Sequence, residues 1–192
     1  TTETLMRLLF FAGSAREGSH NKKLARLGQM IAEANGIEAV FADLADYHMP
    51  IYHGDLEDAE GVPERTQAFK SLLGEYDGVM IVTPEYNSGI PPLLKNTLDW
   101  VSRVGTDPNV FRTRVYAVSG TSPGYYGAMR ALMQLRQVLT VGLGATVIPQ
   151  QMALPNSTKA FAEDGGLVDE KRQKMFADVV EALAVAARKF AA

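Results

Sequence analysis

The sequence predicts one doubly wound α/β domain over residues 1–192, built on a five-stranded parallel sheet with strand order 2-1-3-4-5. Three observations lead to this fold class. Short apolar runs alternate with helical patterns along the whole chain. The apolar runs are continuous, which is typical of strands that are buried on both faces of a parallel sheet. No internal repeat, low-complexity segment or interdomain linker divides the chain.

The elements follow one another in the order that such a sheet requires. Strands are expected at residues 8–12, 38–42, 78–83, 114–119 and 145–148. The first helix carries Leu24, Leu27 and Ile31 at helical spacing and is expected to stop at Asn35-Gly36. Further helices are expected at about 63–73, 92–101 and 128–141, and an amphipathic one through 176–190. Loops are expected at 44–63 and 159–169.

The order of the strands predicts where a ligand binds. Strands 1, 3 and 4 are neighbours at the centre of such a sheet, and right-handed crossovers bring their carboxyl ends to one edge. Ligands of this fold class bind at that edge, near the switch between strands 1 and 3. The loops that follow these three strands are also the most unusual in the chain chemically. The sequence therefore predicts one site that the three loops share.

The first loop, residues 13–21, has the chemistry of a phosphate pocket. Gly13 allows a tight turn, Ser14 and Ser19 offer hydroxyls, and Asn21 offers an amide. The start of the next helix adds free backbone N–H groups and a positive dipole, and Arg16 adds a planar fork of donors. The loop has neither the nucleoside-triphosphate nor the dinucleotide glycine pattern, so a compact dianion is expected. The alternative is that Ser19 only caps the helix and that Arg16 is only solvated.

The second and third loops are suited to a flat polar ligand. Proline and glycine interrupt residues 83–92, so backbone N–H and C=O groups are expected to be free for a ligand. Tyr86 is a candidate to cover an aromatic ring. The small residues at 119–124 permit close approach of the backbone. Tyr125 and Tyr126 either line the site or cap the next helix, and the sequence does not choose between these roles.

These motifs resemble those of the flavodoxin-like NADPH-dependent FMN reductase family. The pattern G-S-x-R-x-x-S-x-N over residues 13–21 is similar to the family's phosphate motif. The pattern T-P-E-Y-N-x-G-x-P-x-x-L-K-N-x-L-D-W over 83–100 resembles its flavin-ring signature along the whole length. S-G-x-S-P-G over 119–124, with Arg130, resembles a third segment. The similarity extends from about Leu8 to Phe190.

The resemblance implies an enzyme with FMN as cofactor and NAD(P)H as co-substrate. It would transfer hydride through FMN to quinones, flavins, azo compounds or metal oxyanions such as chromate. The chemistry is carried by FMN, so no catalytic acid or base is expected from the protein. We expect the backbone of Glu85, not its carboxylate, to face the ring. The implied phosphate-binding residues are Ser14, Arg16, Ser19 and Asn21, with His20 in the same motif, and the implied ring-binding residues are Pro84, Glu85, Tyr86, Asn87, Ser119, Gly120 and Thr121.

The composition argues against nucleic-acid, membrane and metal binding as functions of this chain. The net charge is −3 and no basic run is present, so neither nucleic acid nor a membrane is an expected partner. The chain has no cysteine, and its histidines lack metal-ligand spacing, so no bound metal is expected. The absence of cysteine fits a reducing compartment, so a cytoplasmic location is expected. The rival functions are a flavodoxin-like electron carrier, a class that tends to be strongly acidic, and a flavin-binding sensor with little turnover.

The chain is expected to form a homodimer or a homotetramer. The helices at 92–101 and 128–141 carry Trp100, Met129 and Met133, and this mixture of aromatic, Met and Arg residues is typical of an interface. The charged residues beside them are Asp99, Arg103, Arg130 and Arg136. The alternative is that Trp100 and the methionines pack inward on the monomer's own sheet. The sequence does not choose between NADH and NADPH.

Overall fold

The structure is a computed structural model that describes residues 6–105 and 108–191. Five strands alternate with the helices, and the expected order of elements is confirmed. The strands are β1 (Arg7–Ala12), β2 (Glu38–Ala42), β3 (Gly78–Thr83), β4 (Val115–Thr121) and β5 (Thr146–Leu154). The helices are α1 (His20–Ala34), α2 (Gly54–Glu60), α3 (Glu64–Gly74), α4 (Pro92–Arg103), α5 (Met129–Gln137) and α6 (Glu170–Ala191).

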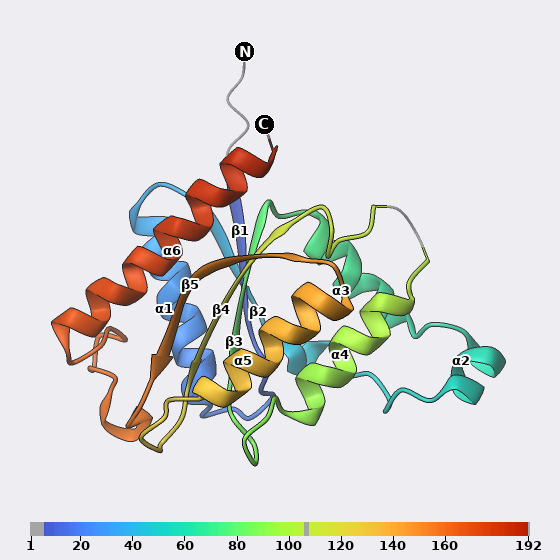
Figure 1. Cartoon of the computed structure of the whole chain (residues 1–192), viewed down its shortest axis with the longest axis horizontal. Coiled ribbons are helices and arrows are strands. Elements are labelled where there is room, and N and C mark those ends of the chain that lie inside the picture. Colours follow the sequence, from blue (N-terminus) through green and yellow to red (C-terminus); the bar gives the residue numbers. More distant parts are fainter. Residues whose placement is uncertain (1–5, 106–107, 192) are drawn as a thin grey trace.

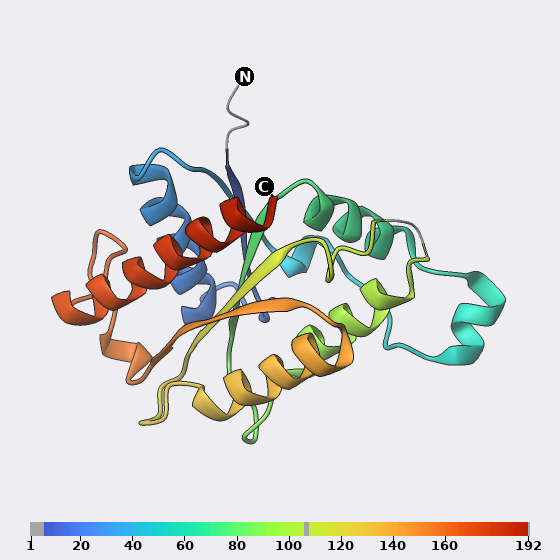
Figure 2. The ribbon, with the colours of Figure 1, turned by 45° about the horizontal axis from the view of Figure 1, so that its top comes forward.

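All neighbouring strands pair in parallel, in the predicted order β2-β1-β3-β4-β5. Helices cover both faces of the sheet, with α1 and α6 on one face and α3, α4 and α5 on the other (Figures 1 and 2). The carboxyl ends of β1, β3 and β4 point to the lower edge of Figure 1, where the loops after them lie together. The three loops that carry the motifs therefore share one edge of the sheet.

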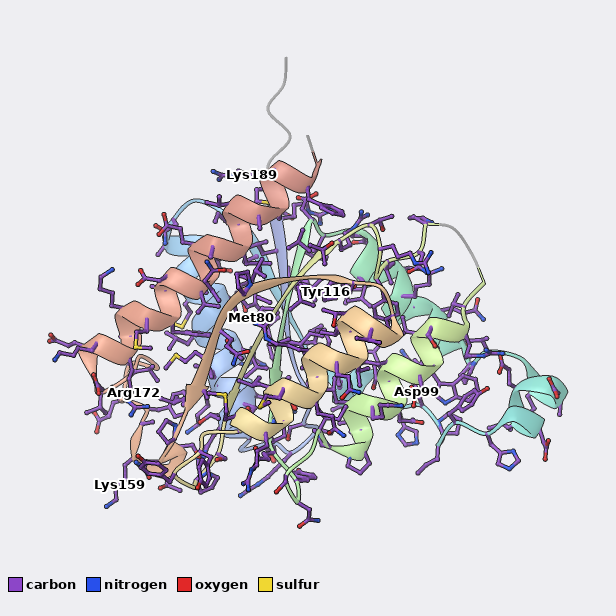
Figure 3. The ribbon with its side chains drawn as sticks, viewed as in Figure 1. Met80, Asp99, Tyr116, Lys159, Arg172 and Lys189 are labelled. Carbon is purple, nitrogen blue, oxygen red and sulfur yellow. The ribbon has the colours of Figure 1, made fainter. Side chains whose placement is uncertain are left out.

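Two apolar cores hold the layers together. Every residue of β3 is buried, and alternate side chains enter opposite cores. Met80 of β3 packs toward α1 and α6, whereas Tyr116 of β4 packs toward the other three helices (Figure 3). Burial on both faces explains why the strands appear in the sequence as continuous apolar runs.

Four segments differ from those expected. β4 continues through Thr121, because Val82 and Thr83 of β3 pair with Ser119 and Gly120. β5 continues past Pro149 to Leu154 as an edge strand, where a proline is tolerated, and its register shifts beside Tyr116 and Val118. The expected loop 44–63 contains the short helix α2, which has no buried residue and therefore no apolar pattern to predict it. The last turn of the helix expected at 128–141 is π-helical, over Val138–Gly142.

Trp100 packs inside the chain, so its assignment to a subunit interface is wrong. The side chain is fully buried, and its indole Nε1 donates to the carbonyl of Pro50 at 2.7 Å. Tyr52 meets the indole edge-on, with ring centroids 5.0 Å apart. The segment before α2 thus supplies the partner that a buried indole N–H requires.

No helix within residues 6–105 and 108–191 has the length and apolar character needed to cross a membrane.

Candidate active site at the carboxyl edge of the sheet

The loop between β1 and α1 is the one for which the sequence predicts a phosphate pocket. Ser14 and Ser19 are each 6% exposed, whereas residues 15–18 are exposed. The hydroxyl oxygen of Ser19 accepts from the amide of Lys22 at 3.4 Å, so Ser19 does cap α1. Its own proton is not used in that bond and remains a donor, so capping and ligand binding are compatible.

The donors of this loop suit a phosphate group. Among the hydrogen bonds of the described chain, the backbone amides of residues 15–18 donate to no protein acceptor. The first turn of α1, which is fully described, carries no acidic residue to oppose an anion. Arg16 is exposed and forms no ion pair with any described residue. Free amides, hydroxyls, a helix N-terminus and a guanidinium are the donor set that a phosphate dianion requires, so the residues fit the phosphate of FMN.

Asn21 joins the first loop to the end of β4. Its side-chain amide donates to the carbonyl of Thr121 at 3.0 Å, and its carbonyl accepts from the amide of Thr121 at 3.0 Å. Both partners are buried, and the hydroxyl of Thr121 donates to the carbonyl of Leu154 at 2.7 Å. These bonds fix the phosphate loop relative to β4 and β5. The side chain of Asn21 is thereby engaged within the protein.

His20 links the same loop to the segment after β5. Its Nδ1 lies 2.7 Å from the hydroxyl oxygen of the buried Ser157, and its ring packs at 6.0 Å from that of Phe161. Burial, together with the positive charges of Lys23 and Arg16, lowers the pKa of His20. The neutral imidazole is therefore favoured beside a loop that already carries cationic groups.

The loop after β3 is a tight hairpin that projects from the lower edge of Figure 1. Tyr86 and Gly89 exchange both backbone hydrogen bonds, at 2.9 and 3.0 Å, around Asn87 and Ser88, whose φ values are +49° and +69°. Two consecutive positive φ values give the turn that best matches the twist of paired strands. The expectation that the whole loop has free backbone groups is therefore wrong for Tyr86 and Gly89. The side chain of Tyr86 is 53% exposed.

Glu85 directs its carboxylate away from the hairpin and into the start of α5. It accepts from the backbone amides of Arg130 at 2.9 Å and Ala131 at 3.2 Å. The guanidinium of Arg130 also donates to it, through Nε at 2.8 Å and through Nη2. Burial opposes the charge, but the bonds from Arg130 and Ala131 outweigh it, so the pKa of Glu85 is lowered. The carboxylate thus caps α5. The backbone of Glu85 is then the part of this residue that is available to a ligand.

The hairpin is attached to α5 at a second point. The amide of Ile90 donates to Oε1 of Gln134 at 2.7 Å. Residues at both ends of the hairpin are therefore held by one helix. No sequence pattern indicates a role for Gln134, because its partner is a backbone amide far away in the chain.

Ser119, Gly120 and Thr121 lie within β4 and not in a loop. The side chains of Ser119 and Thr121 are buried. A Cβ atom on Gly120 would approach the carbonyl oxygen of Thr83 to 2.5 Å, so only glycine lets the two strands come this close. Pro84 follows Thr83 directly and is also buried. Direct contact of these residues with a flavin ring stays a prediction.

Two strongly exposed tyrosines follow β4. Tyr125 is 82% and Tyr126 is 61% exposed, and the guanidinium of Arg130 lies 5.0 Å from the ring centre of Tyr126. The backbone carbonyl of Tyr126 accepts from the amide of Met129 at 3.0 Å, so its main chain does lie at the start of α5, while its ring is exposed. Within the described ranges 6–105 and 108–191, no three histidine, aspartate or glutamate side chains come together as a metal-binding group.

Comparison with known proteins places this site in a family. The sequence profile of the NADPH-dependent FMN reductase family matches residues 6–159, which include the β1, β3 and β4 loops. The chain is 34% identical over 167 residues to a quinone reductase of Escherichia coli, covering 86% of each chain. It is 30% identical over 185 residues to a Pseudomonas aeruginosa protein named NAD(P)H-dependent FMN reductase, covering 96% of each.

A solved structure has the same architecture. The flavoenzyme NAD(P)H:(acceptor) oxidoreductase FerB from Paracoccus denitrificans superimposes with a TM-score of 0.82 at 30% sequence identity. The match covers 97% of this chain and 99% of that one. The similarity therefore includes the phosphate loop, the hairpin and α5 together.

Proposed function

The chain belongs to the NADPH-dependent FMN reductase family, and from this we propose that it is an FMN-dependent NAD(P)H:quinone oxidoreductase. One observation carries the proposal beyond the family match. A loop rich in hydrogen-bond donors and a projecting hairpin lie at the same edge of the sheet, where Asn21 attaches the loop to β4 and Glu85 attaches the hairpin to α5. One part suits a phosphate and the other a planar ring.

FMN, when bound, would supply the hydride chemistry that links NAD(P)H to the acceptor. The chain would bind and orient the reactants. Ser14, Arg16 and Ser19 would hold the phosphate, and the hairpin at Tyr86 would contact the ring. The Glu85 carboxylate accepts hydrogen bonds from Arg130 at the start of α5, so its negative charge is directed away from the proposed position of the ring. No side chain is required to donate or accept a proton.

The range of acceptors belongs to the same proposal. Quinones come first, because relatives that match most of this chain are named for them. Free flavins, azo compounds and chromate are the further acceptors that we propose, since an exposed site with little side-chain recognition discriminates weakly among them. We also propose a cytoplasmic location, because the co-substrate NAD(P)H is available in that compartment.

Steady-state kinetics test the function directly. With FMN loaded, the protein should oxidise NADH or NADPH with a benzoquinone at about 1 s⁻¹ or faster, the lower end of ordinary enzyme turnover. Donor and acceptor should use the same exposed place in turn. Double-reciprocal plots at several quinone concentrations should therefore be parallel. Intersecting lines would mean that both reactants bind together, and negligible turnover would favour an electron carrier or a sensor.

We further propose a homodimer or homotetramer assembled through α5. Its exposed face keeps Met133 at 66% and Met129 at 39% exposure, although Trp100 is not available to it. Light scattering should give two or four times the chain mass of 20.9 kDa. Met133→Glu should shift the mass downward, because a charge would be buried without a partner.

The control for the assembly is Met30→Glu on α1. Met30 is 48% exposed and lies on the opposite face of the sheet, so this change should leave the mass unaltered. A monomer mass for the unaltered protein with FMN bound and full turnover would contradict the assembly.

A further inference from the structure

Lys22 is a buried lysine at the base of the phosphate loop. The residue is only 7% exposed. Lysine is almost never buried unless its charge has a partner, and Lys22 has two hydrogen-bond acceptors. Its Nζ donates to the carbonyl of Ala15 at 3.1 Å and to Oδ2 of Asp43 at 2.6 Å. Lys23, the next residue, is exposed. The sequence alone does not separate the two lysines, because they are adjacent and both lie in the first turns of α1.

The two partners of Lys22 belong to different parts of the fold. Ala15 begins the exposed stretch 15–18, whose amides form the proposed phosphate pocket. Asp43 follows β2 directly, and its other oxygen accepts from the amide of Ala45 at 3.0 Å. Lys22 therefore connects the loop to the end of a neighbouring strand. Asp43 neutralises the charge of Lys22 locally. We therefore expect Lys22 to influence the loop by holding its backbone in place, and only weakly by adding positive charge.

The loop has little other support on this side. A cavity of about 370 Å³ lies between the loop and the segment after β2, and is lined by Ala15, Glu17, Ser19, Lys22, Arg26 and Asp43. Lys22 bonds to Ala15 and Asp43, which both line this cavity. A loop that is already ordered loses less conformational entropy when a ligand binds.

We propose that Lys22 is a positioning residue for the phosphate group of the cofactor. By holding the Ala15 carbonyl, it turns that oxygen's lone pairs toward the ammonium and keeps the amides of the loop available to the phosphate. The proposal rests on the FMN-binding function proposed above. It adds that affinity for the phosphate depends on a side chain that is placed behind the loop.

The test compares FMN with riboflavin, which carries the same ring without the phosphate. Dissociation constants for both are measured by fluorescence titration of the full chain after FMN removal. Lys22→Met should raise the dissociation constant for FMN about tenfold, which is a loss of about 1.4 kcal/mol of binding free energy. The dissociation constant for riboflavin should stay within about twofold of that of the unaltered protein. Lys174→Met, which removes the charge of an exposed lysine paired with Asp178 on α6, should leave both dissociation constants unchanged.

Asp43→Asn provides the second variant. It keeps Lys22 but removes its charged acceptor, so the same FMN-specific loss is expected at a smaller size. The double variant should bind FMN as Lys22→Met does, because both changes break one connection. Thermal unfolding establishes that each chain is folded, and if Lys22→Met does not fold, Asp43→Asn decides the question.

Each outcome has one meaning. Unchanged FMN binding in Lys22→Met, or in Asp43→Asn where that variant decides, overturns the proposal. An equal loss of FMN and riboflavin overturns it too, since a merely structural role would not distinguish the two ligands. If the unaltered protein binds riboflavin as tightly as FMN, the phosphate pocket itself is wrong, and the proposed function fails rather than the role of Lys22.

Discussion

Gly120→Ala should destabilise the protein by about 3 kcal/mol, at the upper end of the usual cost of overpacking. The added Cβ would lie 2.5 Å from the carbonyl oxygen of Thr83 and 3.0 Å from the Cβ of Ala128. The first contact is with backbone in the paired strand β3, which cannot turn aside as a side chain would. Urea unfolding measures the change in the free energy of unfolding.

The same substitution should weaken FMN binding. Thr83 precedes the hairpin and Ala128 precedes α5, so a shift of either moves the ring-binding part of the site. Gly54→Ala is the matched control, because no atom lies within 4 Å of its added Cβ and its φ is not positive. A loss of less than about 1 kcal/mol in Gly120→Ala would show that β3 and β4 can separate easily at this point.

Glu85→Ala should cost about 2 kcal/mol of stability and weaken FMN and riboflavin to the same extent. The change removes the cap on the amides of Arg130 and Ala131, worth about 1 kcal/mol, and a charge-assisted bond from Arg130. The guanidinium is 51% exposed, so solvent limits the contribution of the ion pair. Equal loss of both ligands is expected because Glu85 supports the hairpin and not the phosphate loop.

The effect of Glu85 on stability should depend on pH in a defined direction. Its pKa is lowered in the folded protein, so its contribution is present above the ordinary value of about 4.5 and is lost as the pH falls through the lowered pKa. The difference in unfolding free energy between the unaltered protein and Glu85→Ala should therefore shrink below about pH 4.5. Glu181→Ala, at an exposed position on α6, serves as the control. A difference that is constant from pH 7 to the acid range would contradict a stabilising role for the Glu85 carboxylate.

The central strands were predictable because the sequence records their burial directly. Residues 78–83 form a strand with the expected bounds, and every one of them is buried. The larger errors occur where burial is one-sided or absent. The outer half of β5 passes through Pro149 and polar residues at an edge, and α2 has no buried residue. Neither segment contains the apolar pattern from which strands and helices are predicted.

The meeting of the candidate loops at one edge of the sheet was predictable, but their internal contacts were not. The loops after β1 and β3 stand out by their residue types, whereas the hairpin within the second loop was not expected. The roles of Asn21, Glu85 and Lys22 depend on partners 21 to 100 residues away. A side chain that bonds to a remote backbone group leaves no spacing signal. Trp100 was misassigned for the same reason, since its partner is the carbonyl of Pro50.

The pair of hydrogen bonds between Asn21 and Thr121 has a consequence for transplanting this site. The position requires an uncharged group that presents a donor and an acceptor side by side, as the side-chain amide of asparagine does. Aspartate would lack the donor, and leucine would lack both. The nine-residue phosphate loop is therefore not a separable module. Grafted onto another α/β scaffold, it would need a strand end matching Thr121 to stand in the same place.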